Sequence, residues 1–172
     1  PVPELVTAVG EGNFYRNQDS TLESFGHSGR YNTIPRAEGV LVLSDIKREG
    51  DRIAGNSAAS AWDLGDQVLC LEFHTKMNSL DAEVFKVISE VITLIPAKGF
   101  QALVIYNEGT NFSVGVNLGQ ALFAANLAGW SEISKSVKQG QDIYQALKYA
   151  PFPVVGAPSG MALGGGCEVL LH

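Results

Sequence analysis

Two glycine-containing segments carry the residues of this sequence that are best suited to chemistry. One is Asn111–Leu118, and the other is Gly160–Glu168, which contains the glycine triplet 164–166. Glycines have no β-carbon, so the backbone N–H groups of the triplet can approach a ligand oxygen directly. Amides at the start of a helix favour negative charge there, and removing one such donor costs on the order of 3 kcal/mol of catalysis. The alternative is that these glycines only allow a helix to pack closely on a strand.

Glu168 follows the triplet within one helical turn. A carboxylate beside a desolvated pocket can act as a general acid or base, although one at a helix start can also serve only to stabilise the helix. No Lys-Ser/Thr pair follows the glycines and no GxGxxG opens the first strand–helix turn, which excludes phosphate-loop and dinucleotide signatures. His27, His74 and His172 have no partner at metal or triad spacing, so we expect surface or loop histidines and no metal site.

The elements around these segments alternate between strand and helix. Apolar runs predict strands at 68–73, 101–106 and 153–157, and helical periodicity predicts helices up to Ile95 and over 131–149, with a last helix starting at Cys167. Asn78 or Ser79 is the expected N-cap of the first of these helices, which Pro96 and Gly99 should stop. Strands joined by such crossovers pair in parallel. Both glycine-containing segments should therefore lie at the sheet edge where α/β folds bind ligands.

The N-terminal part has a different pattern. Residues 1–38 are polar without a sustained period, which predicts an irregular linker. Residues 40–46 read as a strand, 48–51 as a turn, and the chain from Arg52 as a returning strand, which together predict a β-hairpin. The chain begins without Met and ends inside an apolar run, so we expect a segment of a longer protein.

Composition narrows the class of protein. The 172 residues are 45% hydrophobic and 17% charged, with a net charge of −6, which excludes general disorder and argues against nucleic-acid binding. No apolar run approaches the roughly 18 residues of a membrane span, so we expect a cytoplasmic protein. Cys70 and Cys167 lie in apolar surroundings and are predicted to be buried free thiols, and Trp62 and Trp130 are predicted to be packing residues.

Together, Phe112–Leu118 and Gly160–Glu168 resemble the two loop motifs of the crotonase (enoyl-CoA hydratase/isomerase) superfamily. Lys76–Leu80 looks like that family's Asn-Ala-Leu segment, and the resemblance spans residues 60–172. It implies an α/β fold with a crotonase-like (ββα)n spiral core, truncated at the C-terminus and preceded by the linker and hairpin. Residues 39–172 would be the N-terminal part of a crotonase-like domain, and 1–38 a linker or the tail of an upstream dehydrogenase domain.

The resemblance also implies roles for particular residues. The backbone N–H groups of Val116 and Gly165 would form an oxyanion hole for a thioester carbonyl, and Glu168 would be the first catalytic glutamate. The expected acyl-CoA-binding residues are Met77, Asn78, Ser113 and Gly115. The implied activity is that of an enoyl-CoA hydratase/isomerase of fatty-acid β-oxidation, with an acyl-CoA thioester as substrate and no cofactor bound by this segment. Homo-oligomers, often trimers, are typical of the family.

Departures from the family pattern leave alternatives open. Val114 and Val116-Asn117 replace the family's Ala and Ala-Asp, and its second glutamate would fall beyond His172. Hydratase and isomerase chemistry are therefore not separated, and we expect the chain alone to have little or no hydratase activity. Pro3–Tyr15 resembles the tail of the helical domain of 3-hydroxyacyl-CoA dehydrogenases, which implies a multifunctional parent protein with an NAD site upstream. The alternatives are a non-catalytic acyl-CoA-binding or assembly module, or an α/β domain with coincidental glycines.

Overall fold

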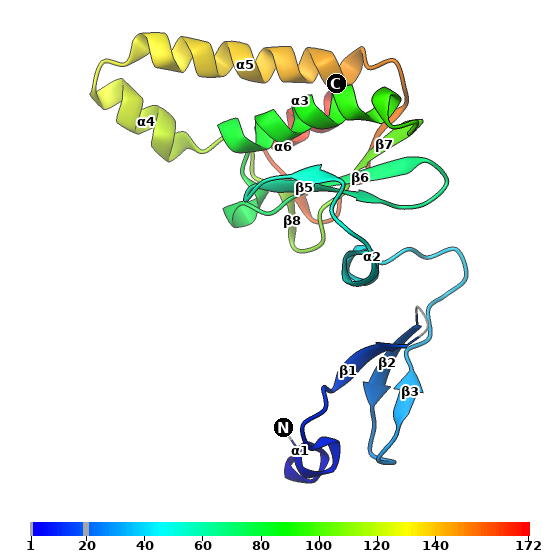
Figure 1. Ribbon diagram of the computed structural model, residues 1–172. Coiled ribbons are helices and arrows are strands. Elements are labelled where there is room, and N and C mark those ends of the chain that lie inside the picture. The colour runs from blue at the N-terminus through cyan, green and yellow to red at the C-terminus, as the bar shows by residue number, and fades with distance from the viewer. Residues whose placement is uncertain (1, 19–20) are drawn as a thin grey trace. The chain divides into compact units, whose positions relative to one another are not determined.

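The computed structural model describes residues 2–18 and 21–172, and the chain forms two compact units, residues 1–49 and 50–172. The elements of the first unit are α1 (Pro3–Val9), β1 (Tyr15–Gln18), β2 (Thr21–Phe25), β3 (Tyr31–Thr33) and α2 (Leu43–Glu49) (Figure 1). Strand β2 pairs antiparallel with both β1 and β3. The sheet is held by an Arg16–Glu23 ion pair of 2.7 Å and by the Arg16 guanidinium, 3.8 Å from the centre of the Tyr31 ring.

Two expectations for this part of the chain are wrong. Residues 1–38 are not irregular, because they form α1 and the small sheet. The cross-strand pairs of that sheet include an ion pair, Arg16–Glu23, and a ring contact, Phe25–Tyr31, and its strands are too short to give a sustained apolar period. The strand expected over 40–46 is replaced by α2, which has Asp45 in its first turn and basic residues in its last, as the helix dipole favours. The origin of 1–38 as the tail of a dehydrogenase domain stays a prediction.

The second unit is built on a five-stranded sheet of order β4-β5-β6-β7-β9. Its strands are β4 (Ala54–Gly55), β5 (Ala59–Asp63), β6 (Val68–Phe73), β7 (Ala102–Ile105) and β9 (Val154–Gly156). The parallel pairing of β6, β7 and β9 confirms the predicted crossovers. The returning strand expected from Arg52 exists as β4, but its antiparallel partner is β5 rather than residues 40–46. Two short strands that the sequence did not indicate, β8 (Asn111–Ser113) and β10 (Met161–Ala162), pair in parallel with each other.

The helices of this unit lie between the strands in sequence. They are the 3₁₀ turn η1 (Lys76–Asn78), α3 (Ala82–Ala97), α4 (Leu118–Asn126), α5 (Trp130–Lys148) and α6 (Gly165–Leu171). The expected N-cap of α3 is wrong: Asp81 caps the helix by accepting the Val84 N–H at 2.9 Å, because Met77 and Asn78 have positive φ and keep the preceding turn non-helical. Helix α3 continues one residue past Pro96, α4 was not predicted, and α6 begins at Gly165 rather than Cys167.

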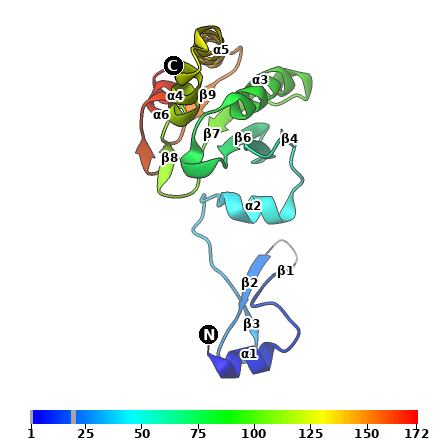
Figure 2. The same cartoon turned by 90° about the vertical axis from the view of Figure 1, so that its left-hand side faces the viewer.

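The core lies between α3 and the sheet. Apolar side chains along one stripe of α3 are at most 1% exposed and pack with those of β6 and β7, as the helical period predicted: Val84, Val87, Ile88, Val91 and Ile95. Figures 1 and 2 show α3 and α5 side by side over one face of the sheet. This packing fixes the start of α3 and one face of α5 beside the loops that follow the strands.

Two side chains, one predicted to be a buried thiol and one a packing residue, are exposed. Cys70 is buried on β6, but Cys167 points outward from α6, whose buried residues are Gly165, Gly166 and Val169. Trp130 is 64% exposed at the first residue of α5. In both cases the exposure of the side chain depends on the helix face or helix end where the residue lies. The hydropathy of the neighbouring residues in the sequence does not predict that position.

Candidate functional site

The turns after β8 and β10 are in direct contact. Leu80 and Val116 form a parallel bridge in which the Leu80 N–H donates to the Gly115 carbonyl at 2.9 Å. Gly115 has a φ of +81°, and a β-carbon placed on it would lie 2.5 Å from the Gly165 nitrogen and 2.8 Å from the Leu163 carbonyl oxygen. Both neighbours are backbone atoms, so a side chain at Gly115 cannot be accommodated without moving one turn from the other. The two glycine-containing segments therefore meet backbone to backbone.

The predicted oxyanion-hole donors belong to these two turns. Val116 follows Gly115 directly, and Gly165 is the first residue of α6, after the Gly164 N-cap. Among the residues that the structure describes, neither Val116 nor Gly165 donates its amide N–H to another residue. Two neighbouring free amides are the arrangement that stabilises a developing oxyanion. Their convergence on a single oxygen stays a prediction.

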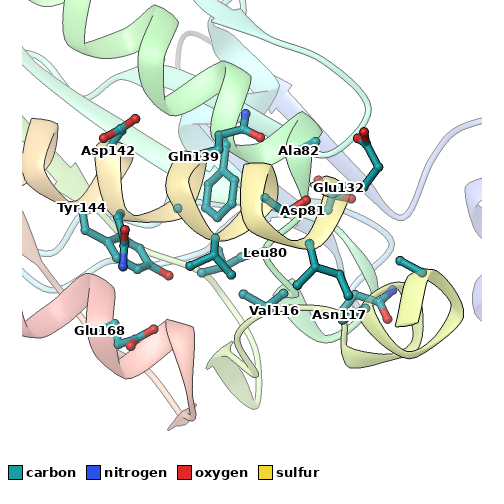
Figure 3. Close-up of a pocket in the computed structure, with 18 of the residues that line it drawn as sticks. Leu80, Asp81, Ala82, Val116, Asn117, Glu132, Gln139, Asp142, Tyr144 and Glu168 are labelled. Atoms are coloured by element: carbon teal, nitrogen blue, oxygen red, sulfur yellow. The ribbon is translucent and has the colours of Figure 1, made fainter. Parts of the chain in front are cut away.

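A cavity of about 760 Å³ opens next to this contact, between α4, α5, α6 and the start of α3 (Figure 3). Its wall combines apolar side chains, among them Leu80, Phe85 and Val116, with the carboxylate of Glu168. Its volume lies within the range of roughly 300–1,000 Å³ that small-molecule sites usually have. The fold thus brings two of the predicted site residues, Val116 and Glu168, to one cavity.

The predicted acyl-CoA-binding residues lie beside the cavity rather than in its wall. Ser113 is fully buried, and its hydroxyl donates to the Asn78 carbonyl at 2.6 Å and accepts the Gly115 N–H at 3.1 Å. The Asn78 amide donates to the Asn111 carbonyl at 2.8 Å, whereas the Met77 side chain is half exposed. Ser113 and Asn78 therefore hold the turn that presents Gly115 and Val116. Contact of these four residues with acyl-CoA stays a prediction.

Tyr144 is a residue of this region that the sequence indicated only as part of an apolar helix face. Its ring is 8% exposed, and its hydroxyl donates to the Gly165 carbonyl at 3.3 Å. Burial, and to a smaller degree the negative charge of Glu168, raise the pKa of Tyr144 to about 12, so the phenol is neutral and keeps its proton. The sequence could have indicated Tyr144, because it is a tyrosine on the apolar face of a predicted helix. A buried phenol usually has a hydrogen-bond partner, and such a partner can be part of a site.

Within residues 2–18 and 21–172, no three His, Cys, Asp or Glu side chains lie together as a metal site would require. Over residues 2–18 and 21–172, no helix combines the length and apolar character needed to cross a bilayer.

His74 is exposed on the loop after β6, as the sequence predicted, and its ring nitrogens contact the Ser57 carbonyl and the Ser60 hydroxyl.

Comparison with known proteins gives relatives in both sequence and structure, although no protein-family model matches the chain. A probable 3-hydroxyacyl-CoA dehydrogenase of Bacillus subtilis is 34% identical over 162 residues, which cover 94% of this chain and 20% of that protein. A putative fatty acid oxidation complex trifunctional enzyme of Rickettsia prowazekii is 37% identical over 98 residues, which cover 57% of this chain and 14% of that protein. The chain therefore spans a small part of the length of these relatives.

Among solved structures, an enoyl-CoA hydratase from Bacillus anthracis has a TM-score of 0.59 to this chain at 21% identity. The likeness covers 67% of this chain and 45% of that one. At this level of identity the likeness establishes the fold.

Proposed function

Because 67% of this chain has the crotonase fold seen in an enoyl-CoA hydratase, we propose that it forms part of a site that binds acyl-CoA thioesters and stabilises their enolates. The sequence-based prediction of a crotonase-like α/β fold is confirmed, whereas the linker and hairpin expected before it are wrong. The proposed activity is of the enoyl-CoA hydratase/isomerase type. In a longer protein it would belong to fatty-acid oxidation, as the name of the Rickettsia relative suggests.

The observation that carries this proposal is the backbone contact between the turns of Gly115 and Gly165. The two turns carry the N–H groups of Val116 and Gly165, which donate to no other residue among those described, and they adjoin a cavity that Val116 and Glu168 line. Preformed amide donors need no reorganisation when charge develops, and this makes such sites effective for thioester carbonyls. Contact between the two glycine turns thus supports the assignment more strongly than either motif alone.

In the proposed reaction, Glu168 is the base and the two amides receive the charge. When Glu168 takes a proton from the α-carbon of an acyl thioester, the C–H electron pair forms the C=C bond of the enolate. The carbonyl π electrons then move onto the thioester oxygen, which the Val116 and Gly165 amides would stabilise. In hydration, Glu168 would take a proton from water as the water oxygen bonds to the β-carbon, and the C=C electrons would move toward the thioester oxygen to form an enolate that carries the new β-hydroxyl group. The protonated Glu168 would then return its proton to the α-carbon.

The oxyanion hole is tested with acetoacetyl-CoA, whose enolate absorbs in the near ultraviolet. The wild-type chain should produce a saturable enolate band that CoA without an acyl group does not produce. Val116→Pro removes the amide donor and no internal hydrogen bond of the described residues, so the enolate fraction should fall on the order of 100-fold. Val116→Ala keeps the N–H and alters a side chain that is 48% exposed, so it should stay close to wild type.

The role of Glu168 is tested separately by deuterium exchange at the α-carbon of butyryl-CoA. Glu168→Gln should slow this exchange by about 10²–10⁴-fold, whereas Glu90→Gln, on the exposed side of α3, should not change it. Binding of the thioester without enolate or exchange would instead support the non-catalytic acyl-CoA-binding module. No binding at all would refute the proposal.

Several finer expectations stay predictions. They are an upstream NAD site, a homo-oligomeric assembly, a cytoplasmic location, and little or no crotonyl-CoA hydration by this chain alone. The matched residues cover 20% and 14% of the two relatives, so the comparisons do not bear on these four expectations.

A further inference from the structure

Tyr144 has a hydroxyl group that the packing of its ring does not require. Its ring is enclosed in the second unit, edge-on to Phe85 with ring centres 6.4 Å apart and stacked on His172 at 5.6 Å. A phenylalanine would fill the same space, so the enclosure does not explain the hydroxyl group. That hydroxyl reaches the first residue of α6, where it donates to the Gly165 carbonyl.

The fit around Gly165 is close on several sides. A β-carbon placed on Gly165 would lie 2.9 Å from the Tyr144 oxygen, 3.3 Å from Leu80 Cδ1 and 3.5 Å from the Gly115 α-carbon. Gly165 is therefore confined between the phenol, the bridge residue Leu80 and the neighbouring turn. Because densely packed groups transmit small displacements, the phenol oxygen is one of the three groups that limit where the Gly165 backbone can lie.

Glu168 lies one turn further along α6. Figure 3 shows Glu168 on α6 and Tyr144 on α5 at the same part of the cavity wall, and the Glu168 N–H donates to the Gly164 carbonyl at 3.1 Å. A shift of the first turn of α6 would therefore move both the predicted amide donor and the predicted base. The neutral state of the phenol is consistent with its being a hydrogen-bond donor over the whole physiological pH range.

We propose that Tyr144 is a positioning residue of the site: its hydroxyl holds the Gly165 carbonyl and thereby fixes the Gly165 amide and Glu168 at the cavity. This inference rests on the proposed function for its catalytic consequence, but the contact itself can be tested without it. Tyr144 does not need to touch the substrate. The phenol acts through the first turn of α6.

The first test is Tyr144→Phe, with Tyr149→Phe as the matched control because Tyr149 is 72% exposed at the end of α5. An oxyanion hole is complementary to the enolate rather than to the neutral thioester. Tyr144→Phe should therefore lower the enolate fraction of bound acetoacetyl-CoA about tenfold, the effect of one lost hydrogen bond, with a smaller change in affinity for butyryl-CoA. A purely structural tyrosine would change the thermal midpoint but leave the ratio of enolate to bound thioester unaltered.

The second test does not depend on any activity. The Gly165 carbonyl and the Gly166 N–H share one peptide group, so loss of the phenol hydrogen bond should shift the ¹⁵N-edited NMR signal of the Gly166 amide. The Gly166 N–H donates to the Leu163 carbonyl at 2.9 Å, so its hydrogen exchange should also become faster in Tyr144→Phe, but not in Tyr149→Phe.

The outcomes separate the two hypotheses. Gly166 signals that do not respond to Tyr144→Phe would overturn the positioning role, as would an unchanged enolate fraction in a wild type that does form the enolate. If the wild-type chain forms no enolate, the proposed function fails. The Gly166 amide then decides by itself whether Tyr144 holds the turn.

Discussion

The substitution Gly115→Ala tests the contact on which the site depends. Two costs are expected. An alanine at the φ of +81° adopted by Gly115 costs about 1–2 kcal/mol. Its β-carbon, at 2.5 Å from the Gly165 nitrogen, would also force apart two backbone segments, and such overpacking typically costs about 1–3 kcal/mol. The expected loss of unfolding free energy is thus about 2–5 kcal/mol, a large share of the roughly 5–15 kcal/mol of a typical domain.

Gly65→Ala isolates the steric part of this loss. Gly65 has a φ of +85°, nearly the same as Gly115, but a β-carbon there would meet nothing within 4 Å. The conformational cost and the effect of alanine on the unfolded chain are therefore common to the two variants. The remaining difference is the collision with Gly165 and Leu163, about 1–3 kcal/mol.

Urea denaturation followed by circular dichroism measures this difference. With a slope of about 2 kcal/mol per molar urea, the midpoint of Gly115→Ala should lie about 0.5–1.5 M below that of Gly65→Ala. Equal midpoints would mean that the two turns are not in contact, and the argument for neighbouring amides would be refuted.

Two further substitutions test the walls of the cavity. Gly140→Ala should raise the free energy of unfolding by about 0.5–1 kcal/mol, because a glycine inside a helix is unfavourable. A β-carbon at Gly140 would lie 3.7 Å from Phe85, which is an ordinary contact. A lower thermal midpoint than that of the wild type would show that the wall of the cavity cannot accept this methyl group. The pKa of Tyr144 is raised from 10.0 to about 12, so the unfolded chain loses this proton first and stability should fall as the pH rises from 10 to 12. The loss of unfolding free energy should be roughly 2 kcal/mol and should be absent in Tyr144→Phe. Urea midpoints measured at pH 10 and pH 12 give this loss for each protein. Equal losses in the two proteins would show that Tyr144 is not the group whose pKa is raised.

Local patterns were sufficient for the strands and helices that have an apolar face. The run at 68–73 and the stripe from Val84 to Ile95 gave β6 and α3, because each buries its apolar side chains against the other. Elsewhere the pattern was misleading. The N-terminal sheet has an Arg16–Glu23 ion pair across its strands and no sustained apolar period, and the mostly apolar residues 40–46 enter α2 at Leu43.

The sequence by itself determined the fold of the second unit and the glycines and carboxylate of the candidate site, because those residue types are required locally by a positive φ, a missing β-carbon and a helix start. It could not determine which residues meet. The family resemblance led us to expect the two glycine-containing segments side by side, but the backbone contact of Gly115 with Gly165 and the hydrogen bond of Tyr144 to Gly165 join positions far apart in the chain. Such contacts arise from the packing of whole helices on the sheet, and no local pattern encodes them.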